Sequence, residues 1–193
     1  MKDNVLVTGA SSGLGMYLVQ KFESEGHGIF YHGGKKHYDL SERREVYDLA
    51  MEARKFNVKI LVNNAAIVCP SILLQDYDIN LITKMIDVNL KAPILLSSML
   101  LEDLTNIINI NSMVGLETKS PRTLYSATKW GLRGFSNSLK AENQDLNVLD
   151  VYPTNIKTTP ERENAMDVTM VVNKIYEAYL NNTTELILDG RKG

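Results

Sequence analysis

Tyr125 and Lys129 are the two side chains whose type and spacing best fit acid–base chemistry. They stand four residues apart in the segment 124–142, which predicts a helix, so they share one helix face. A tyrosine with its ordinary pKa of about 10 is a poor base at neutral pH, and a neighbouring ammonium favours the phenolate and lowers that pKa. Such a pair more often lies on a solvated helix surface, so its meaning depends on the elements around it.

A glycine-rich turn near the N-terminus predicts a phosphate-binding loop. Residues 8–15 read Thr-Gly-Ala-Ser-Ser-Gly-Leu-Gly, after a short apolar run and before a segment with helical spacing of apolar residues. Glycines let a pyrophosphate approach the backbone, and a helix N-terminus offers it free N–H groups and partial positive charge. The order of strand, turn and helix favours a nucleotide site over a tight turn without a ligand.

Six short apolar runs alternate with longer helical patterns along the chain. The runs are continuously apolar, which is typical of parallel strands buried on both faces. We therefore predict an α/β fold, a doubly wound parallel sheet of Rossmann type in three layers, as a single domain over residues 1–193. The strands are expected at residues 5–8, 29–31, 59–62, 107–110, 148–152 and 185–188. The helices are expected at 14–24, 42–55, 80–101 with a break or kink at Pro93, 124–142 and 168–180.

Composition narrows the possible functions. Apolar residues make up 44% of the 193 residues and the net charge is −2, which gives no reason to expect a nucleic acid or an anionic membrane as partner. The single cysteine, Cys69, cannot form an internal disulfide, and the three histidines lack companions at metal-ligand spacing, so we expect no metal. Without a run of about 18 apolar residues, we expect no membrane span and a cytoplasmic protein that binds a small molecule.

The Thr-Gly-x-x-x-Gly-x-Gly spacing resembles that of the non-extended short-chain dehydrogenase/reductases, and the resemblance continues through most of the chain. Residues 63–66, Asn-Asn-Ala-Ala, are similar to the family's Asn-Asn-Ala-Gly, with alanine in the last place. Residues 125–129 reproduce Tyr-x-x-x-Lys, and Pro153 and Thr158 fit a Pro-Gly-x-x-x-Thr segment in which Thr154 replaces glycine. Three further matches are the Asp39–Leu40 pair, Asn89 and Ser112.

The resemblance implies an NAD(P)-dependent oxidoreductase that transfers a hydride at a carbonyl or alcohol. Tyr125 would then donate the proton to the carbonyl oxygen or take it back, and Ser112 would polarise that oxygen. Lys129 would hold the nicotinamide ribose, and Asn89 would support a water that links Lys129 to solvent. The residues expected at the cofactor are Gly9, Ser11, Ser12, Gly13, Leu14, Gly15, Gly33, Lys35, Lys36, Asp39, Leu40, Asn63, Ala65, Ala66, Lys129, Pro153, Ile156 and Thr158.

Two segments are shorter than the family's pattern. Only seven residues, 32–38, separate the second strand from Asp39, so the usual helix there should be absent or reduced to a turn, leaving room for a short strand at 36–38. Only residues 154–167 precede the last helix, so we expect a small lid, an open pocket for varied or bulky carbonyl compounds, and modest turnover. The short C-terminus favours a dimer through the helices containing Asn89 and Tyr125 over a tetramer.

Cofactor choice depends on the residues after the second strand. An acidic residue there would favour NAD, but none precedes Asp39. Lys35 and Lys36 could pair with the 2′-phosphate of NADP, so we expect NADP to be preferred over NAD; the alternative is that both lysines are ordinary solvated surface charges. Two other functions stay open: a nucleotide-binding regulatory or scaffolding protein on the same fold, which the shortened segments favour, and a nucleotide-sugar epimerase or dehydratase, for whose substrate domain the chain lacks room.

Overall fold

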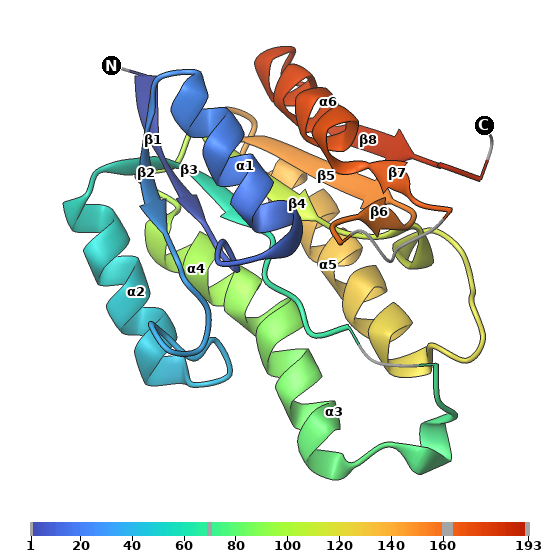
Figure 1. Cartoon of the computed structure of the whole chain (residues 1–193). Helices are drawn as coiled ribbons and strands as arrows, with labels where there is room; N and C mark the ends of the chain where they lie inside the picture. The colour runs from blue at the N-terminus through green and yellow to red at the C-terminus, as the bar shows by residue number, and fades with distance from the viewer. Residues whose placement is uncertain (1, 69–70, 160–163, 192–193) are drawn as a thin grey trace.

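A six-stranded parallel sheet forms the centre of the molecule (Figure 1). The structure, a computed structural model, describes residues 2–68, 71–159 and 164–191. Cys69 lies outside the described residues. The strand order is β2-β1-β3-β4-β5-β8. The strands are β1 (Lys2–Val7), β2 (His27–Tyr31), β3 (Val58–Asn63), β4 (Asn106–Ile110), β5 (Asn147–Pro153) and β8 (Glu185–Leu188). Val5, Leu6 and Val7 are fully buried, as the uninterrupted apolar run of a central strand requires.

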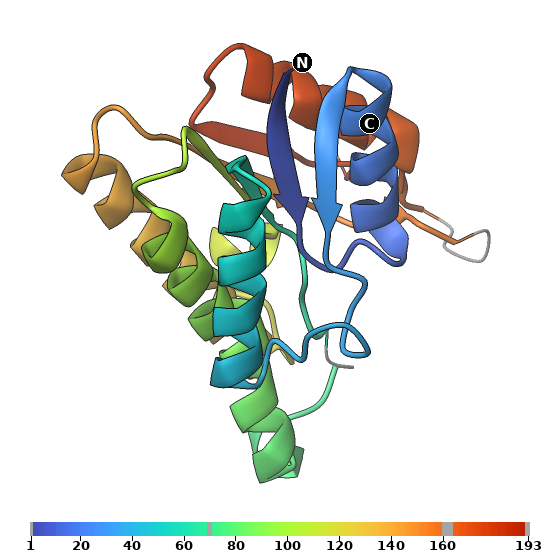
Figure 2. The same ribbon diagram turned by 90° about the vertical axis from the view of Figure 1, so that its left-hand side faces the viewer.

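Helices cover both faces of the sheet, as Figure 2 shows. On one face, α1 (Gly13–Ser24) and α6 (Val168–Leu180) enclose a core that includes Leu18 and Ile175. On the other face, α2 (Arg43–Lys55), α4 (Ala92–Leu100) and α5 (Thr123–Glu142) enclose a second core, with Leu49 and Leu96 among its members. The predicted three-layer α/β fold is therefore confirmed. No helix in the described part of the chain is long and apolar enough to cross a bilayer.

The helical region expected over residues 80–101 consists of three parts. It begins as α3 (Ile79–Ile86), which extends beyond the sheet in Figure 1, passes through a π-helical turn, η2 (Asp87–Lys91), and continues as α4. Pro93 explains the change, because it has no N–H to donate to the carbonyl of Asn89 four residues earlier. The distortion therefore lies on the N-terminal side of Pro93 and includes Asn89.

The shortened segments differ in part from expectation. No helix forms in residues 32–38, between β2 and Asp39, as predicted, but the strand suggested at residues 36–38 is wrong. The chain turns there instead, with Gly34 at φ +85° and the His37 amide donating to the Gly34 carbonyl at 2.8 Å. In the lid segment, β6 (Ile156–Lys157) pairs with β7 (Met166–Asp167), while residues 160–163 lie outside the described part. Two short 3₁₀ turns complete the fold, η1 (Leu74–Asp76) and η3 (Met113–Gly115).

Candidate active site

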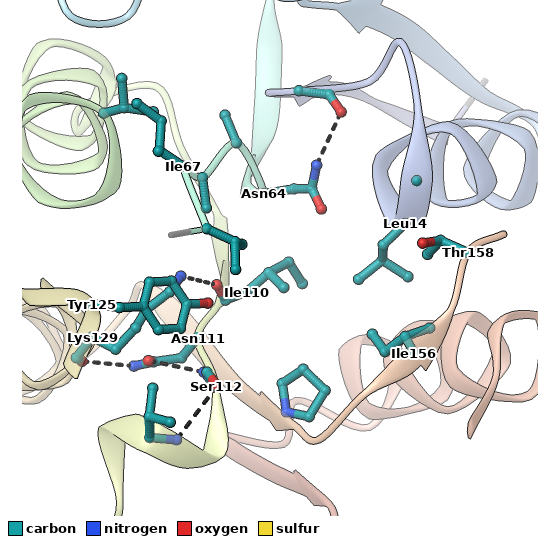
Figure 3. Close-up of a pocket in the computed structure, with 18 of the residues that line it drawn as sticks. Leu14, Asn64, Ile67, Ile110, Asn111, Ser112, Tyr125, Lys129, Ile156 and Thr158 are labelled. Atoms are coloured by element: carbon teal, nitrogen blue, oxygen red, sulfur yellow. Dashed lines mark hydrogen bonds between the residues drawn. The ribbon is translucent and has the colours of Figure 1, made fainter. Parts of the chain in front are cut away.

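A cavity of about 830 Å³ opens at the carboxyl ends of the strands, between the loops after β1, β3, β4 and β5 (Figure 3). The strand order diverges between β1 and β3, which is where open α/β sheets hold ligands. The predicted residues that line the cavity are Gly9, Ser11, Ser12, Gly13, Leu14, Lys35, Asp39, Leu40, Ala65, Ala66, Ser112, Tyr125, Lys129, Pro153, Ile156 and Thr158. The lining does not include Gly15, Gly33, Lys36, Asn63 or Asn89.

The glycine-rich loop is packed too tightly for larger residues at two positions. Gly9 has φ +65°, and a Cβ there would lie 2.9 Å from the Ala65 Cα. A Cβ on Gly15 would collide with the Gly9 carbonyl oxygen and approach the Asn64 side chain. The absence of a side chain at Gly15 therefore allows α1 to pack against the loop. This packing explains why a glycine is needed at position 15, although Gly15 does not line the cavity.

The N-terminus of α1 fits a phosphate group. Its N-cap, Ser12, makes no side-chain capping hydrogen bond, and no acidic residue occupies the first turn. A Cβ added to Gly13 would meet nothing closer than the Thr158 side chain at 4.0 Å, so the approach to the backbone is open. Free N–H groups and the positive end of the helix dipole thus face the cavity, as a pyrophosphate requires.

Asn64, not Asn63, supports this loop. The Asn64 amide donates to the carbonyls of Thr8 (2.8 Å) and Gly9 (3.1 Å), and the Thr8 hydroxyl accepts from the backbone N–H of Asn64 at 3.0 Å. Asn63 points elsewhere and donates to the Asn109 side chain at 2.8 Å beneath α5. Consecutive residues of a strand point to opposite faces, so strand alternation was the signal that could have separated the two asparagines.

His32, which sequence reasoning did not select, holds the loop from the side of β2. Its Nδ1 accepts from the Gly9 N–H at 3.1 Å, and its Nε2 lies 2.7 Å from the Tyr38 carbonyl, which defines an Nε2–H tautomer. Burial lowers the pKa of His32, in agreement with a neutral ring in this role.

Asp39 lies at the far end of the cavity from Tyr125, among the residues that follow β2. Its carboxylate accepts from the Ser41 N–H (3.0 Å) and hydroxyl (2.7 Å) and pairs with the Lys35 ammonium at 3.1 Å. Burial works to raise the pKa of Asp39, but the hydrogen bonds from Ser41 and Lys35 outweigh it and hold that pKa below its usual value. Lys35 is thus a cavity residue with a carboxylate partner, whereas Lys36 stands outside the lining.

Ser112, Tyr125 and Lys129 come together at the opposite end of the cavity (Figure 3). The Lys129 Nζ donates to the Ile110 carbonyl at 2.8 Å and lies 5.7 Å from the centroid of the Tyr125 ring. Only 2% of Lys129 is exposed, and this burial lowers its pKa to about 8. The helical spacing of four residues therefore does place both side chains at one site.

Tyr125 does not have the lowered pKa that we expected from its lysine neighbour. Burial raises the pKa of Tyr125, while a hydrogen bond with Ser112 and the positive charge of Arg122 act in the opposite direction. The prediction failed because it considered the charge of Lys129 without the loss of water around the phenol. The tyrosine is a protonated acid at neutral pH.

Two asparagines organise the backbone around these groups. The Asn111 side chain accepts from the Ser112 N–H at 3.0 Å and donates to the Lys129 carbonyl at 3.2 Å, which ties the end of β4 to α5. Asn89 donates to the Ile67 carbonyl (2.9 Å) and accepts from the Ile67 N–H (2.7 Å), which ties η2 to the loop after β3. Asn111 was missed, although a polar residue directly after a buried strand is a usable signal.

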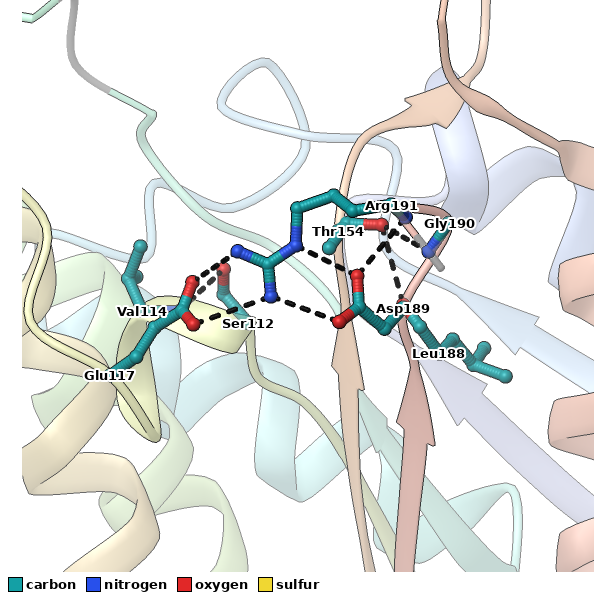
Figure 4. A network of polar contacts seen from close by, with 8 residues as sticks. All are labelled: Ser112, Val114, Glu117, Thr154, Leu188, Asp189, Gly190 and Arg191. Carbon is teal, nitrogen blue, oxygen red and sulfur yellow. Dashed lines mark hydrogen bonds and ion pairs between the residues drawn. The ribbon is translucent and has the colours of Figure 1, made fainter. Parts of the chain in front are cut away.

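Further charged groups surround the end of the cavity that contains Ser112 and Tyr125. Arg191, after β8, binds the carboxylates of Glu117 and Asp189 above Ser112 (Figure 4). Arg122, at the start of α5, and Lys119 also line the cavity. The described residues contain no group of three or more His, Cys, Asp or Glu side chains that could hold a metal ion.

Comparison of the chain with known proteins agrees with this architecture. A family model described as short chain dehydrogenase matches residues 35–168. Sorbitol-6-phosphate 2-dehydrogenase of Klebsiella pneumoniae is 30% identical over 230 aligned positions, which span 100% of this chain and 85% of the relative.

Solved structures share the fold at lower sequence identity. The bulky-bulky ketone specific alcohol dehydrogenase of Comamonas testosteroni superposes with a TM-score of 0.85 at 23% identity, covering 96% of this chain and 86% of that one. A short-chain dehydrogenase from Sphingobium yanoikuyae in complex with NADPH gives a TM-score of 0.82 at 21% identity, covering 96% and 87%. Fold, family match and sequence relatives lead to one conclusion: the chain belongs to the short-chain dehydrogenase family of oxidoreductases.

Proposed function

We propose that this protein is an NADP-dependent carbonyl reductase or alcohol dehydrogenase whose acid–base residue is Tyr125. The observation that carries the proposal is one continuous cavity, with the glycine-rich loop and the N-terminus of α1 at one end and the hydroxyls of Ser112 and Tyr125 at the other. Such a cavity can hold a dinucleotide along its length and present a carbonyl to both hydroxyls. A nicotinamide nucleotide bound there would supply the hydride.

The two hydroxyls have complementary tasks. Tyr125 is protonated at neutral pH because burial raises its pKa, so it donates a proton to the oxygen of a carbonyl in the reduction direction. The Ser112 oxygen accepts a weak hydrogen bond from the Val114 N–H at 3.4 Å, and its hydroxyl hydrogen can turn from Tyr125 to donate to the same carbonyl oxygen. The oxygen that becomes negative during reduction is thereby stabilised by two donors.

Lys129 supplies positive charge and further donors beside Tyr125. One ammonium hydrogen is bound to the Ile110 carbonyl, and the others are available for a ribose hydroxyl and for a proton path to Tyr125. We propose that the main-chain carbonyl of Asn89 binds the water on that path. The Asn89 side-chain amide is already bound to Ile67, and Pro93 has no N–H that could donate to the Asn89 carbonyl.

Replacing Tyr125 by phenylalanine tests the reaction. The variant removes one hydroxyl and keeps the ring, so we expect it to bind NADPH as the wild type does, followed by nicotinamide fluorescence. The rate of NADPH oxidation with a panel of aldehydes, ketones and quinones should fall about 1,000-fold, in the range of general acid catalysis. Tight nucleotide binding with no turnover by the wild type would instead support a nucleotide-binding protein without this activity.

Preference for NADP is proposed to depend on Lys35. Lys35 lines the cavity and its ammonium is exposed, so it can exchange Asp39 for a 2′-phosphate. Lys35→Met should weaken NADPH binding about 10-fold and leave NADH binding nearly unchanged, measured as Kd for each nucleotide. Lys36→Met is the matched control, because Lys36 is outside the lining, and an equal effect of both substitutions would contradict the assignment.

We also propose a homodimer through α3 and α5. Ile79 is 75% exposed, and Ile86 and Trp130 are also large apolar side chains exposed on these helices. A second copy would remove this apolar surface from water. Analytical ultracentrifugation should show a dimer for the wild type and a larger monomer fraction for Ile79→Lys. A monomeric wild type would contradict this assembly.

A further inference from the structure

Arg122 is a cation without a partner in the part of the chain that the structure describes. It is the N-cap residue of α5, three positions before Tyr125, and its side chain makes no capping hydrogen bond. It lines the cavity, and its Nε is buried with no hydrogen-bond partner among the described residues. The terminal nitrogens of the guanidinium are not buried in this way, and they too have no hydrogen-bond or ion-pair partner among the described residues, so they are available to an anion in the cavity.

The carboxylate nearest in sequence cannot supply it, because Glu117 is already engaged. Its two oxygens accept from the Arg191 guanidinium at 2.7 and 3.3 Å, and Arg191 is also held by Asp189 at 2.8 and 3.0 Å (Figure 4). All three members of this group are therefore engaged with one another, and the group carries a net charge of −1. Both Glu117 and Arg191 line the cavity, but neither is left to serve Arg122.

Two more cations line the same cavity. Lys84, on α3, and Lys119, before α5, are exposed, and neither forms an ion pair with any described carboxylate. At the other end of the cavity, Lys35 is paired with Asp39. The unpaired positive charge is thus concentrated on the segments around Tyr125, beyond the loop that fits the phosphates of a dinucleotide.

We propose that Arg122 binds an anionic group of the carbonyl substrate, a carboxylate or a phosphate, with Lys119 and Lys84 adding attraction from the rim. The proposal rests on the proposed function, since it places the carbonyl at Ser112 and Tyr125. The planar guanidinium can donate two parallel hydrogen bonds to such an anion. Because Arg122 begins the helix turn that carries Tyr125 and both residues line one cavity, the proposed anion lies a few bonds from the carbonyl, as in a short oxo acid or a keto phosphate.

Matched substrates separate this role from a general effect on the reaction. Acetoacetate is compared with methyl acetoacetate, and dihydroxyacetone phosphate with dihydroxyacetone, using NADPH and the wild type, Arg122→Met, Arg122→Lys and Arg44→Met. Arg44 is an exposed arginine of α2 outside the cavity and serves as control. In Arg122→Met, the kcat/KM ratio of anionic to neutral substrate should fall roughly 10- to 100-fold, the loss expected for one charge-assisted contact. Arg122→Lys should retain part of the preference, and Arg44→Met all of it.

The two substrate pairs show whether the anion is a carboxylate or a phosphate. An equal loss for the anionic and the neutral member of each pair would mean that Arg122 acts only through Tyr125, and would overturn the anion site while leaving the reductase in place. If nothing is reduced, calorimetric titration with acetoacetate and with inorganic phosphate still decides the matter. Binding that Arg122→Met abolishes and Arg44→Met keeps would support the site without the reaction, and its absence in the wild type would overturn the site.

Discussion

Helix α5 carries two lysines, one in each half of the helix, in different electrostatic surroundings. Lys129 and Lys140 are eleven residues apart, about three helical turns, so both face the sheet. Lys140 is bound to the Asp150 carboxylate at 3.0 Å and to the Thr184 carbonyl at 3.0 Å. Lys129 is more deeply buried, yet its ammonium is bound only to a backbone carbonyl, that of Ile110, in the described structure.

The difference separates stability from function along a single element. At the Lys140 end, Ser136 and Lys140 both bind the Asp150 carboxylate, so each buried charge has a partner. At the Lys129 end, burial lowers the lysine pKa to about 8 although the Asp150 carboxylate, which forms no ion pair with Lys129, acts in the opposite direction, and this burial reduces the stability of the fold. A buried charge that destabilises the fold is typical of a functional site, here the position of the ammonium beside Tyr125.

The largest expected effect distinguishes the two lysines by catalysis. Lys129→Met removes the ammonium beside Tyr125 and should lower kcat/KM for carbonyl reduction about 1,000-fold. Lys140→Met changes a side chain far from the cavity and should leave kcat/KM within about 2-fold in steady-state assays under conditions where both variants are folded. Comparable losses of kcat/KM in both variants would contradict the different roles given to Lys129 and Lys140.

Stability should show the reverse order. Lys140→Met leaves the Asp150 carboxylate buried without its partner and should lower the free energy of unfolding by about 3 kcal/mol, measured by urea denaturation. Lys129→Met replaces an unpaired buried charge by an apolar chain of similar shape and should be neutral or stabilising. The double variant Lys140→Met/Asp150→Asn should recover part of the loss. A large destabilisation by Lys129→Met alone would show that its bond to Ile110 is worth more than its burial costs.

The smallest expected effect is a dependence of stability on pH. The folded-state pKa of Lys129, about 8, lies below the unfolded value of about 10.5, so the unfolded chain binds more protons between these values. The destabilisation from Lys129 is therefore complete below pH 8 and disappears as the pH rises past 10.5. Between pH 7.5 and 9.5, wild type should gain about 2 kcal/mol relative to Lys129→Met in urea denaturation. A constant difference would contradict the lowered pKa.

The fold and the centre of the site could be predicted because they depend on local patterns. Uninterrupted apolar runs specify buried parallel strands, and a tyrosine and a lysine four residues apart must share a helix face. The glycines of the first turn likewise act through their own backbone and immediate neighbours. The family resemblance added the roles of Ser112 and Asn89, which no spacing rule supplies.

The rest depends on tertiary contacts that a sequence does not display. The raised pKa of Tyr125 comes from burial, and the Glu117–Arg191 pair joins residues 74 positions apart. That Lys35 has a carboxylate partner, and that Arg122 has none among the described residues, is visible only when the neighbours are placed. Asn63 was preferred to Asn64 because strand alternation places the two side chains on opposite faces but does not show which face carries the glycine-rich loop.

The central claim is that this cavity transfers a hydride from a nicotinamide to a carbonyl carbon under the control of Tyr125. The most direct measurement is mass spectrometry of the alcohol formed when the wild type acts on the aldehydes and ketones of the panel with NADPH deuterated at both positions of nicotinamide C4. The account predicts one deuterium on the carbinol carbon, and no product from Tyr125→Phe over the same time. Product without deuterium, or deuterated product formed equally fast by Tyr125→Phe, would contradict it.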